Sequence, residues 1–214
     1  MTEELLSDAP ALSAWVTPAF QREFSFKISD ALINGTGVGM PLGILNAGCT
    51  VEVTAETGQG AATLIADNVI KMYARRFGPN TGNYAWLINQ DIEPQLHTMS
   101  LIIGAGGVPV YMPAGGWSGA QYGSLFGRPV IPCEQCATLG TVGDIILADL
   151  SQYIIAEKGG VQSASSIHVK FLEGETLFRF TYRCDGQPWW NAALTRYKGS
   201  STQSPFVALS SSRT

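Results

Sequence analysis

The stretch that decides the fold lies at residues 31–45 and reads ALINGTGVGMPLGIL. It opens with apolar residues, and Asn34-Gly35 then supplies the left-handed backbone position at which many helices end. Four glycines and one proline follow within residues 35–43, a composition typical of a turn-rich linker. The stretch therefore predicts that a helix ends here and that a linker leads into the rest of the chain.

A long helix is predicted upstream of this linker, over Ala9–Ile33. Ser7 and Asp8 are good N-cap residues, and Pro10 suits the first helical turn, where its missing N–H is not needed. At 1.5 Å per residue the helix would be about 38 Å long. The alternation over Phe24–Ile28 leaves a strand-like or broken middle as the competing interpretation. The apolar residues that recur at helical spacing are Leu12, Trp15, Val16, Phe20, Phe24, Ile28 and Leu32.

Downstream of the linker, helical patterns give way to strands. A second helix is predicted over Gly60–Arg76, a buried strand over Tyr84–Ile88, and a short helix from a cap at Asp91 to Met99. Helices first and strands last indicate an α+β fold in two lobes. Further strands are expected at 129–132, 143–150, 152–156, 167–172 and 176–183, and a Ser/Thr-rich tail at 200–214.

The composition is unusually poor in charge. Charged residues make up 14% of the 214 residues, against roughly 25% in a typical domain. Two interpretations stay open: neighbouring subunits cover much of the surface, or Gly- and Ser-rich loops provide an uncharged polar surface. The net charge is −4 at pH 7, which argues against a protein whose main work is binding nucleic-acid phosphates.

The sequence also lacks membrane and export signals. No stretch approaches the roughly 20 apolar residues that span a bilayer, and residues 1–14 lack the basic and apolar parts of a signal peptide. We expect a protein made in a reducing cytoplasm, with free thiols at Cys49, Cys133, Cys136 and Cys184.

One cysteine pair has the spacing of a metal half-site. Pro-Cys-x-x-Cys at residues 132–136 matches the second half of the zinc deaminase signature. Neither His97 nor His168 supplies the His-x-Glu first half, and the other two cysteines are isolated. Two thiols in a loop is the ordinary interpretation, and a zinc-dependent enzyme around Cys133 and Cys136 is the alternative from another class.

Other patterns have ordinary structural explanations. Gly35-x-Gly37-x-Gly39 follows a predicted helix, whereas a dinucleotide loop follows a strand. Trp189-Trp190 suits a carbohydrate platform, but a hairpin turn with interface anchors is favoured. The chain has no Gly-x-Ser-x-Gly elbow. We predict no catalytic, cofactor-binding or metal-binding residue, and no cofactor.

Several segments occur in the order known from one family. They are Asp8-Ala9-Pro10-x-Leu12, Ala31–Gly37, Gly39-x-Pro41-x-Gly43-Ile44-Leu45, Trp86-Leu87-Ile88-Asn89, Gly127-Arg128-Pro129-Val130 and Gly143–Tyr153. Together they cover nearly the whole chain and resemble the Hong Kong 97-type major capsid proteins of tailed bacteriophages.

The resemblance implies a Hong Kong 97-type α+β fold, with a long spine helix in a peripheral domain and a mixed axial domain. We expect the peripheral domain at residues 1–44 and 166–214 and the axial domain at 45–165. Family members carry an N-terminal arm and an extended hairpin ahead of the spine helix. The chain is therefore expected to correspond to a C-terminal portion that stays monomeric or forms small rings, and no crosslink residue is predicted.

The implied function is that of a structural subunit of an icosahedral phage or prophage capsid that encloses the genome, and not an enzyme. The expected partners are copies of the chain, in hexamers and pentamers for the full-length protein, other capsid or portal proteins, and DNA enclosed without sequence-specific binding; no membrane is expected. The expected location is the virion capsid, with assembly in the host cytoplasm. An encapsulin-like nanocompartment shell is the alternative within this fold. The uncharged region Gly104–Gly127 is expected near a symmetry axis, where repeated like charges would repel.

Overall fold

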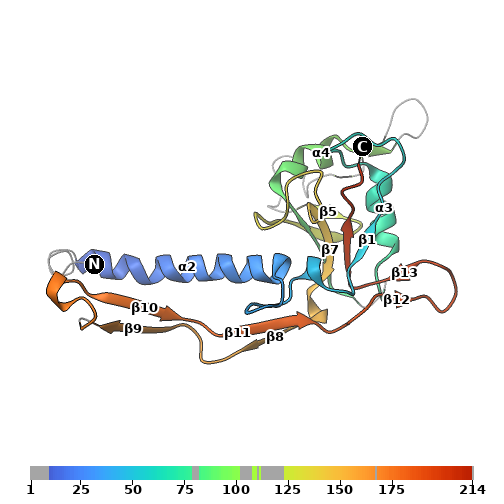
Figure 1. Ribbon diagram of the computed structural model, residues 1–214. Helices are drawn as coiled ribbons and strands as arrows, with labels where there is room; N and C mark the ends of the chain where they lie inside the picture. Colours follow the sequence, from blue (N-terminus) through green and yellow to red (C-terminus); the bar gives the residue numbers. More distant parts are fainter. Residues whose placement is uncertain are drawn as a thin grey trace.

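The computed structural model describes residues 10–78, 82–101, 108–109, 111, 123–166 and 168–213. These residues form a rounded lobe with a long stalk that projects to one side (Figure 1). The stalk consists of one long helix and an antiparallel ribbon, and the lobe contains a six-stranded sheet with two short helices against it. Helices and mixed sheets together confirm the expected α+β class.

The predicted long helix is confirmed as α2, Pro10–Asn34, which runs the length of the stalk. The strand-like interpretation of residues 24–28 is wrong, because these residues lie inside a continuous helix of 25 residues. Pro18 lies in its interior and lacks the N–H of a regular helical hydrogen bond.

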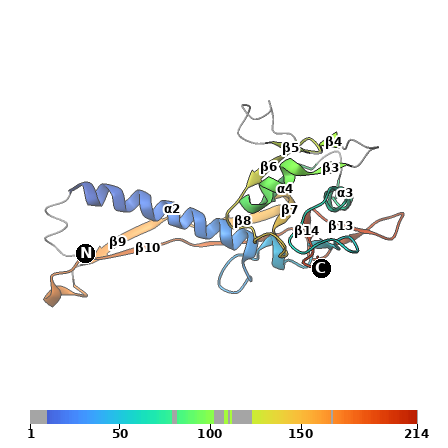
Figure 2. The same cartoon turned by 90° about the horizontal axis from the view of Figure 1, so that it is seen from above.

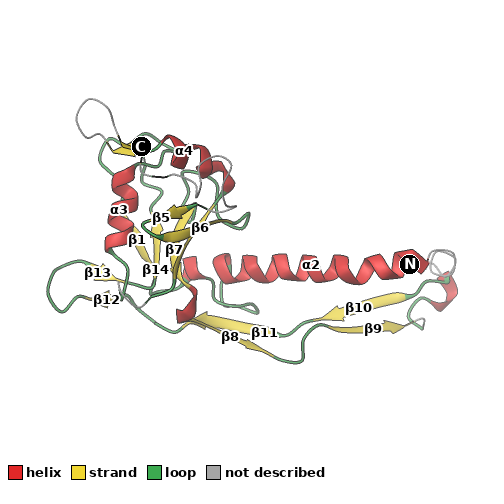
Figure 3. Ribbon diagram, turned by 180° about the vertical axis from the view of Figure 1, so that it is seen from behind, coloured by secondary structure: helices red, strands yellow, loops and turns green. Residues whose placement is uncertain are grey.

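A bent antiparallel ribbon runs beside α2 (Figure 3). Strand β8, Tyr153–Glu157, pairs with β11, Cys184–Pro188, and β9, Gln162–Ser166, pairs with β10, Leu177–Thr181. The ribbon turns at the distal end of the stalk through the 3-10 helix η5, Phe171–Glu173. The strand expected at 167–172 is therefore wrong over its described residues, because a turn ending at Gly174, φ +63°, occupies this segment.

The lobe is built on a sheet with the strand order β1-β14-β7-β2-β6-β5. Strand β2 is antiparallel to β7 and parallel to β6, so Trp86 lies between Leu147 and Val130. Strand β14 is parallel to β1 and antiparallel to β7. The strands are β1, Val51–Val53; β2, Tyr84–Ile88; β5, Ser124–Leu125; β6, Arg128–Pro132; β7, Ile145–Asp149; and β14, Phe206–Leu209.

Alternate residues of each central strand enter two different hydrophobic clusters. On β2, Trp86 and Ile88 join the cluster that α3 and α4 cover, while Leu87 joins the cluster at the base of the stalk. On β7, Leu147 belongs to the first cluster and Ile146 to the second. Burial on both faces explains why these strands read as continuous apolar runs.

Both short helices of the lobe differ in detail from expectation (Figure 2). The helix predicted over 60–76 is only α3, Ala66–Ala74, because Ala62 has a left-handed φ of +52° and Leu64 N–H donates to Gln95 Oε1 at 2.6 Å. The expected cap at Asp91 is wrong: Asn89 Oδ1 accepts the Asp91 N–H at 3.0 Å. The 3-10 helix η2, Gln90–Ile92, and helix α4, Glu93–Thr98, follow.

The tail expected at 200–214 is wrong, because β14 is fully buried between β1 and β7. Both parts of the molecule contain strands from both of the expected domain ranges. Strand β14, from the 166–214 range, lies in the lobe sheet, whereas β8 and most of β9, from the 45–165 range, lie in the stalk. Strands that pair with each other can come from distant parts of the chain, so each part of the molecule combines strands from both ranges.

The remaining elements are short. Among the helices that the structure describes, none has the length and apolar character needed to cross a bilayer. The short elements are η1, Ile44–Asn46; β3, Ser100–Leu101; β4, Val108–Pro109; η4, Leu150–Gln152; β12, Leu194–Thr195; and β13, Thr202–Gln203.

Candidate functional site

The distal end of the stalk exposes large apolar side chains. Leu172 is 99% exposed, and Phe171 and Val169 are also exposed in the turn around η5. Trp15, near the start of α2, is 66% exposed. Apolar side chains gathered in this way on a projecting element are typical of a surface that another protein covers.

The helix of the stalk is covered on one side only. Phe20 stacks on Phe180 of β10 with ring centroids 4.2 Å apart, and Phe24 contacts Tyr182 at 6.3 Å. Among the α2 side chains that the structure describes, only Val16 and Ile33 are buried. Because an exposed helix gains little from its own hydrogen bonds in water, the uncovered side of the stalk is a second candidate contact surface.

The base of the stalk is held rigidly by the linker that the sequence singled out. A Cβ atom on Gly35 would lie 2.1 Å from the Pro41 carbonyl oxygen, and one on Gly43 would lie 2.4 Å from the Gly35 nitrogen. Leu42 N–H donates to Gly186 of β11 at 2.8 Å, and its carbonyl accepts the Tyr153 hydroxyl at 2.7 Å. The glycines allow the backbones to touch, and this contact sets the direction of the stalk.

A basic pocket lies on the lobe between α3 and the β12–β13 hairpin. It has a volume of about 450 Å³, and Arg76, Arg196 and Lys198 line it together with Tyr197 and Gln203. Arg196 donates to the Ala74 carbonyl at the C-terminal end of α3, where a cation is favourable. None of these cations forms an ion pair with a residue that the structure describes, and the Nε atoms of Arg76 and Arg196 are buried without an acceptor there.

Arg75 is a further cation beside this pocket. Burial, together with the charge of Arg196, lowers the pKa of its guanidinium. Arg75 donates to the carbonyl and the hydroxyl of Thr202, which fixes β13 to the end of α3. Arg75 therefore holds the β12–β13 hairpin in place beside the pocket.

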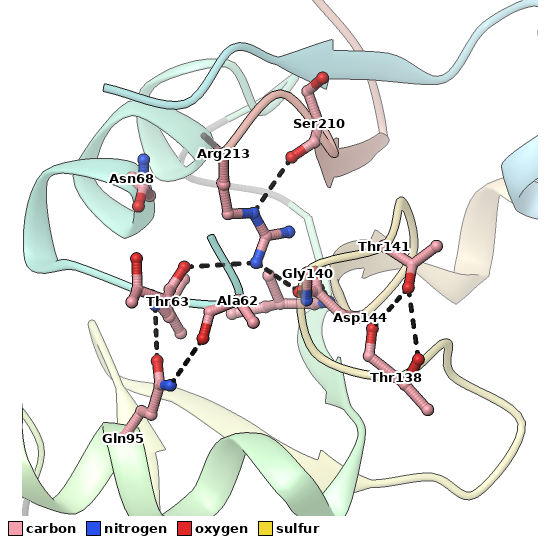
Figure 4. Close-up of polar contacts among 12 residues, drawn as sticks. Ala62, Thr63, Asn68, Gln95, Thr138, Gly140, Thr141, Asp144, Ser210 and Arg213 are labelled. Carbon is pink, nitrogen blue, oxygen red and sulfur yellow. Dashed lines mark hydrogen bonds and ion pairs between the residues drawn. The ribbon is translucent and has the colours of Figure 1, made fainter. Parts of the chain in front are cut away.

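A buried ion pair joins Arg213 to Asp144 inside the lobe (Figure 4). Both side chains are fully buried, with Nη1 of Arg213 2.5 Å from Oδ2 of Asp144. The carboxylate also accepts the Gly140 N–H at 2.9 Å and the Ile145 N–H at 2.7 Å. A buried pair with this many partners holds the loop before β7 against the segment after β14.

The structure does not bring together the residues of the zinc alternative. Cys133 and Cys136 lie in the turn after β6, whereas His97 lies on α4 against Tyr111 and His168 lies between β9 and η5 of the stalk. Within the described ranges, no group of three His, Cys, Asp or Glu side chains is placed to hold a metal ion.

The other sequence patterns are also accounted for. Trp190 is partly buried against Phe77 at 4.9 Å, and its Nε1 donates to Gln152 at 3.0 Å, while Trp189 is exposed. The Gly35–Gly39 glycines form the linker at the base of the stalk. The expectation for Gly104–Gly127 falls mostly outside the described residues.

Sequence reasoning missed two of these surfaces. Phe171-Leu172 was assigned to a strand, although the nearby Lys170 and Gly174 could have indicated an exposed turn. The basic pocket combines Arg76 with Arg196 and Lys198, which are more than a hundred positions away in sequence, so no local pattern signals it.

Comparison with known proteins gives a consistent result. A model of the phage capsid family matches residues 1–199. The capsid of an empty GTA particle, computed with C5 symmetry, superposes with a TM-score of 0.71 at 18% identity, over 97% of this chain and 69% of that chain. The capsid of the native GTA particle, computed with C5 symmetry, gives 0.68 and 18%, over 97% and 68%. No curated protein matches. The structural likeness confirms the expected Hong Kong 97-type fold.

Proposed function

Because this chain belongs to the phage capsid family, we propose that copies of it assemble through the stalk into the hexamers and pentamers of an icosahedral shell. The chain is a structural subunit of a capsid shell, and its place is the virion capsid.

The observation that carries the proposal is the uncovered stalk. Its helix has a partner on one side only, and its distal turn exposes Phe171 and Leu172. In a lone subunit these side chains would stay in water, and contact with a neighbouring copy would remove them from it. The low content of charged residues, 14%, fits a surface that neighbours cover.

We further propose that the stalk and the lobe are the two domains of the subunit. The stalk corresponds to the peripheral domain, and the lobe corresponds to the axial domain near the centre of a capsomer. The boundary follows the spatial units, so β8 to β11 belong with α2, and β14 belongs with the lobe. Other capsid or portal proteins would meet the assembled shell, which would form in the host cytoplasm.

The contact role of the stalk is tested by self-association. Sedimentation velocity over a range of concentrations should show the chain associating into small rings. Leu172→Glu should shift this association to at least tenfold higher concentration, because it would bury a charge in the contact. Ser163→Glu adds the same charge to an exposed polar position of the same ribbon and should leave association unchanged. If Leu172→Glu associates like the unchanged chain, the distal turn is not a contact.

The content of the shell is tested on particles purified from cells. We propose that the shell encloses DNA without sequence-specific binding. Nuclease-treated particles should therefore retain DNA of mixed sequence. Particles that hold a cargo protein and no protected DNA would favour the encapsulin-like alternative. No observation on the described residues favours a zinc-dependent enzyme around Cys133 and Cys136.

A further inference from the structure

The turn after β6 contains two cysteines, Cys133 and Cys136, at the base of the stalk. The Cys136 N–H donates to the Cys133 carbonyl at 3.2 Å, which closes a tight turn over residues 133–136. The ends of such a turn lie within about 7 Å, and a disulfide needs Cα atoms about 4.4–6.8 Å apart. Both side chains belong to the same hydrophobic cluster, with Cys136 buried in it and Cys133 packed against it. The turn therefore brings the two residues near the separation that a disulfide requires.

The two thiols differ in exposure and acidity. Cys133 is partly exposed, whereas Cys136 is buried. The neighbouring Cys136 side chain lowers the pKa of Cys133 to about 7. The neighbouring Cys133 side chain, followed by burial, raises the pKa of Cys136. This asymmetry is the one required of an attacking thiolate and a resolving thiol.

The turn also connects the stalk to the lobe. The side-chain amide of Asn34, the last residue of α2, donates to the Gln135 carbonyl at 2.9 Å. The side-chain amide of Asn89, directly after β2, donates to the Cys136 carbonyl at 2.9 Å. A covalent bond across residues 133–136 would therefore fix the carbonyl groups that hold the end of α2 against the sheet.

We propose that Cys133 and Cys136 form a reversible disulfide clasp at the base of the stalk, made by exchange with a low-molecular-weight disulfide such as oxidised glutathione. The Cys133 thiolate attacks one glutathione sulfur, a mixed disulfide forms, and one glutathione leaves as thiolate. Cys136 then loses its proton and attacks the Cys133 sulfur, which releases the second glutathione. The protein dithiol is oxidised by two electrons, and one glutathione disulfide is reduced to two thiols.

The test uses the full chain, incubated in buffers of graded glutathione redox potential and then quenched by alkylation. Intact mass should show the loss of two hydrogen atoms, and peptide mapping should join residues 133 and 136 in one intrachain disulfide. Hydrogen exchange of the backbone amides at residues 133–137 should slow several-fold in the oxidised form. These measurements need no variant, so they do not depend on how a substitution affects folding.

Matched variants assign the two roles. Cys136→Ser should stop at a stable glutathione adduct on Cys133, because the resolving thiol is gone. Cys133→Ser should give no adduct on Cys136, which is only 4% exposed. Cys184→Ser removes another partly exposed thiol and should oxidise like the unchanged chain. If both thiols of the unchanged chain remain alkylatable at the most oxidising potential, the pair only packs in the core and the proposal is wrong. A disulfide that involves Cys184 instead would overturn it as well.

Discussion

At the scale of single residues, the lobe depends on one ion pair that water does not reach. Arg213 and Asp144 are both fully buried, so removing one partner leaves the other charged and without its counter-ion. We expect Asp144→Ala to lower the free energy of unfolding by about 3–5 kcal/mol, measured by urea denaturation. The Lys71–Glu56 pair, in which Lys71 is exposed and Glu56 is half-buried, is the control, and Lys71→Met should cost about 1 kcal/mol or less. Similar losses in both variants would contradict the importance of burial.

The glycine contacts at the base of the stalk make a second prediction at this scale. Gly43→Ala places a methyl group 2.4 Å from the Gly35 nitrogen and 2.6 Å from the Ile33 carbonyl oxygen, so the backbone must move. We expect a loss of about 1–3 kcal/mol by chemical denaturation, as for other forced overpacking. Gly60→Ala meets only the Thr63 methyl at 3.5 Å and should be nearly neutral. If Gly43→Ala is as stable as Gly60→Ala, the close approach of the two backbone segments does not set the stalk direction.

At the scale of elements, α2 contains its own weak point. Pro18 cannot donate a hydrogen bond in the helix interior, a defect that costs about 3 kcal/mol in a regular helix. Pro18→Ala should therefore slow hydrogen exchange in residues 10–20. Ser25→Ala, an exposed change further along the same helix, should leave exchange of that segment unaltered. Unchanged exchange in Pro18→Ala would mean that this part of the helix opens for another reason.

The elements also show what the sequence can predict. The long helix and β2 were predicted correctly because their patterns are long or continuously apolar. Strand β14 was missed because four apolar residues follow a Ser/Thr-rich segment, and only its distant partners β1 and β7 give them a place. The turn at 168–174 was missed because its apolar side chains point into solvent, where a neighbour would cover them. Local patterns cannot report a partner from elsewhere in the chain or from another copy.

At the scale of the whole molecule, the lobe and the stalk should differ in local stability. Strands β2, β7 and β14 are buried on both faces, while α2 rests on a ribbon along one side. In the unassembled chain, amides of α2 should exchange through local opening, much faster than those of β7. Assembled particles should show slowed exchange in α2, because a neighbour would cover it. Uniform protection of both parts in the free chain would contradict this view.

The functional surfaces were harder to predict than the fold. The family resemblance pointed to a shell subunit through ordered segments, and the family match bears this out. The contacts themselves depend on three-dimensional proximity. Arg76 and Arg196 line the same pocket because Arg75 holds β13 against the end of α3. The exposure of Leu172 depends on how the ribbon turns.

The position of β14 has a consequence for synthesis on the ribosome. Among the strands that the structure describes, β1 joins the lobe sheet only through β14, which lies between it and β7. Residues 51–53 emerge well before their hydrogen-bonding partners at 206–209, because synthesis proceeds at roughly 5–20 residues per second. A nascent chain therefore cannot complete its lobe until residues 206–209 have emerged. Translation itself would delay the appearance of an assembly-ready subunit and keep unfinished chains out of the growing shell.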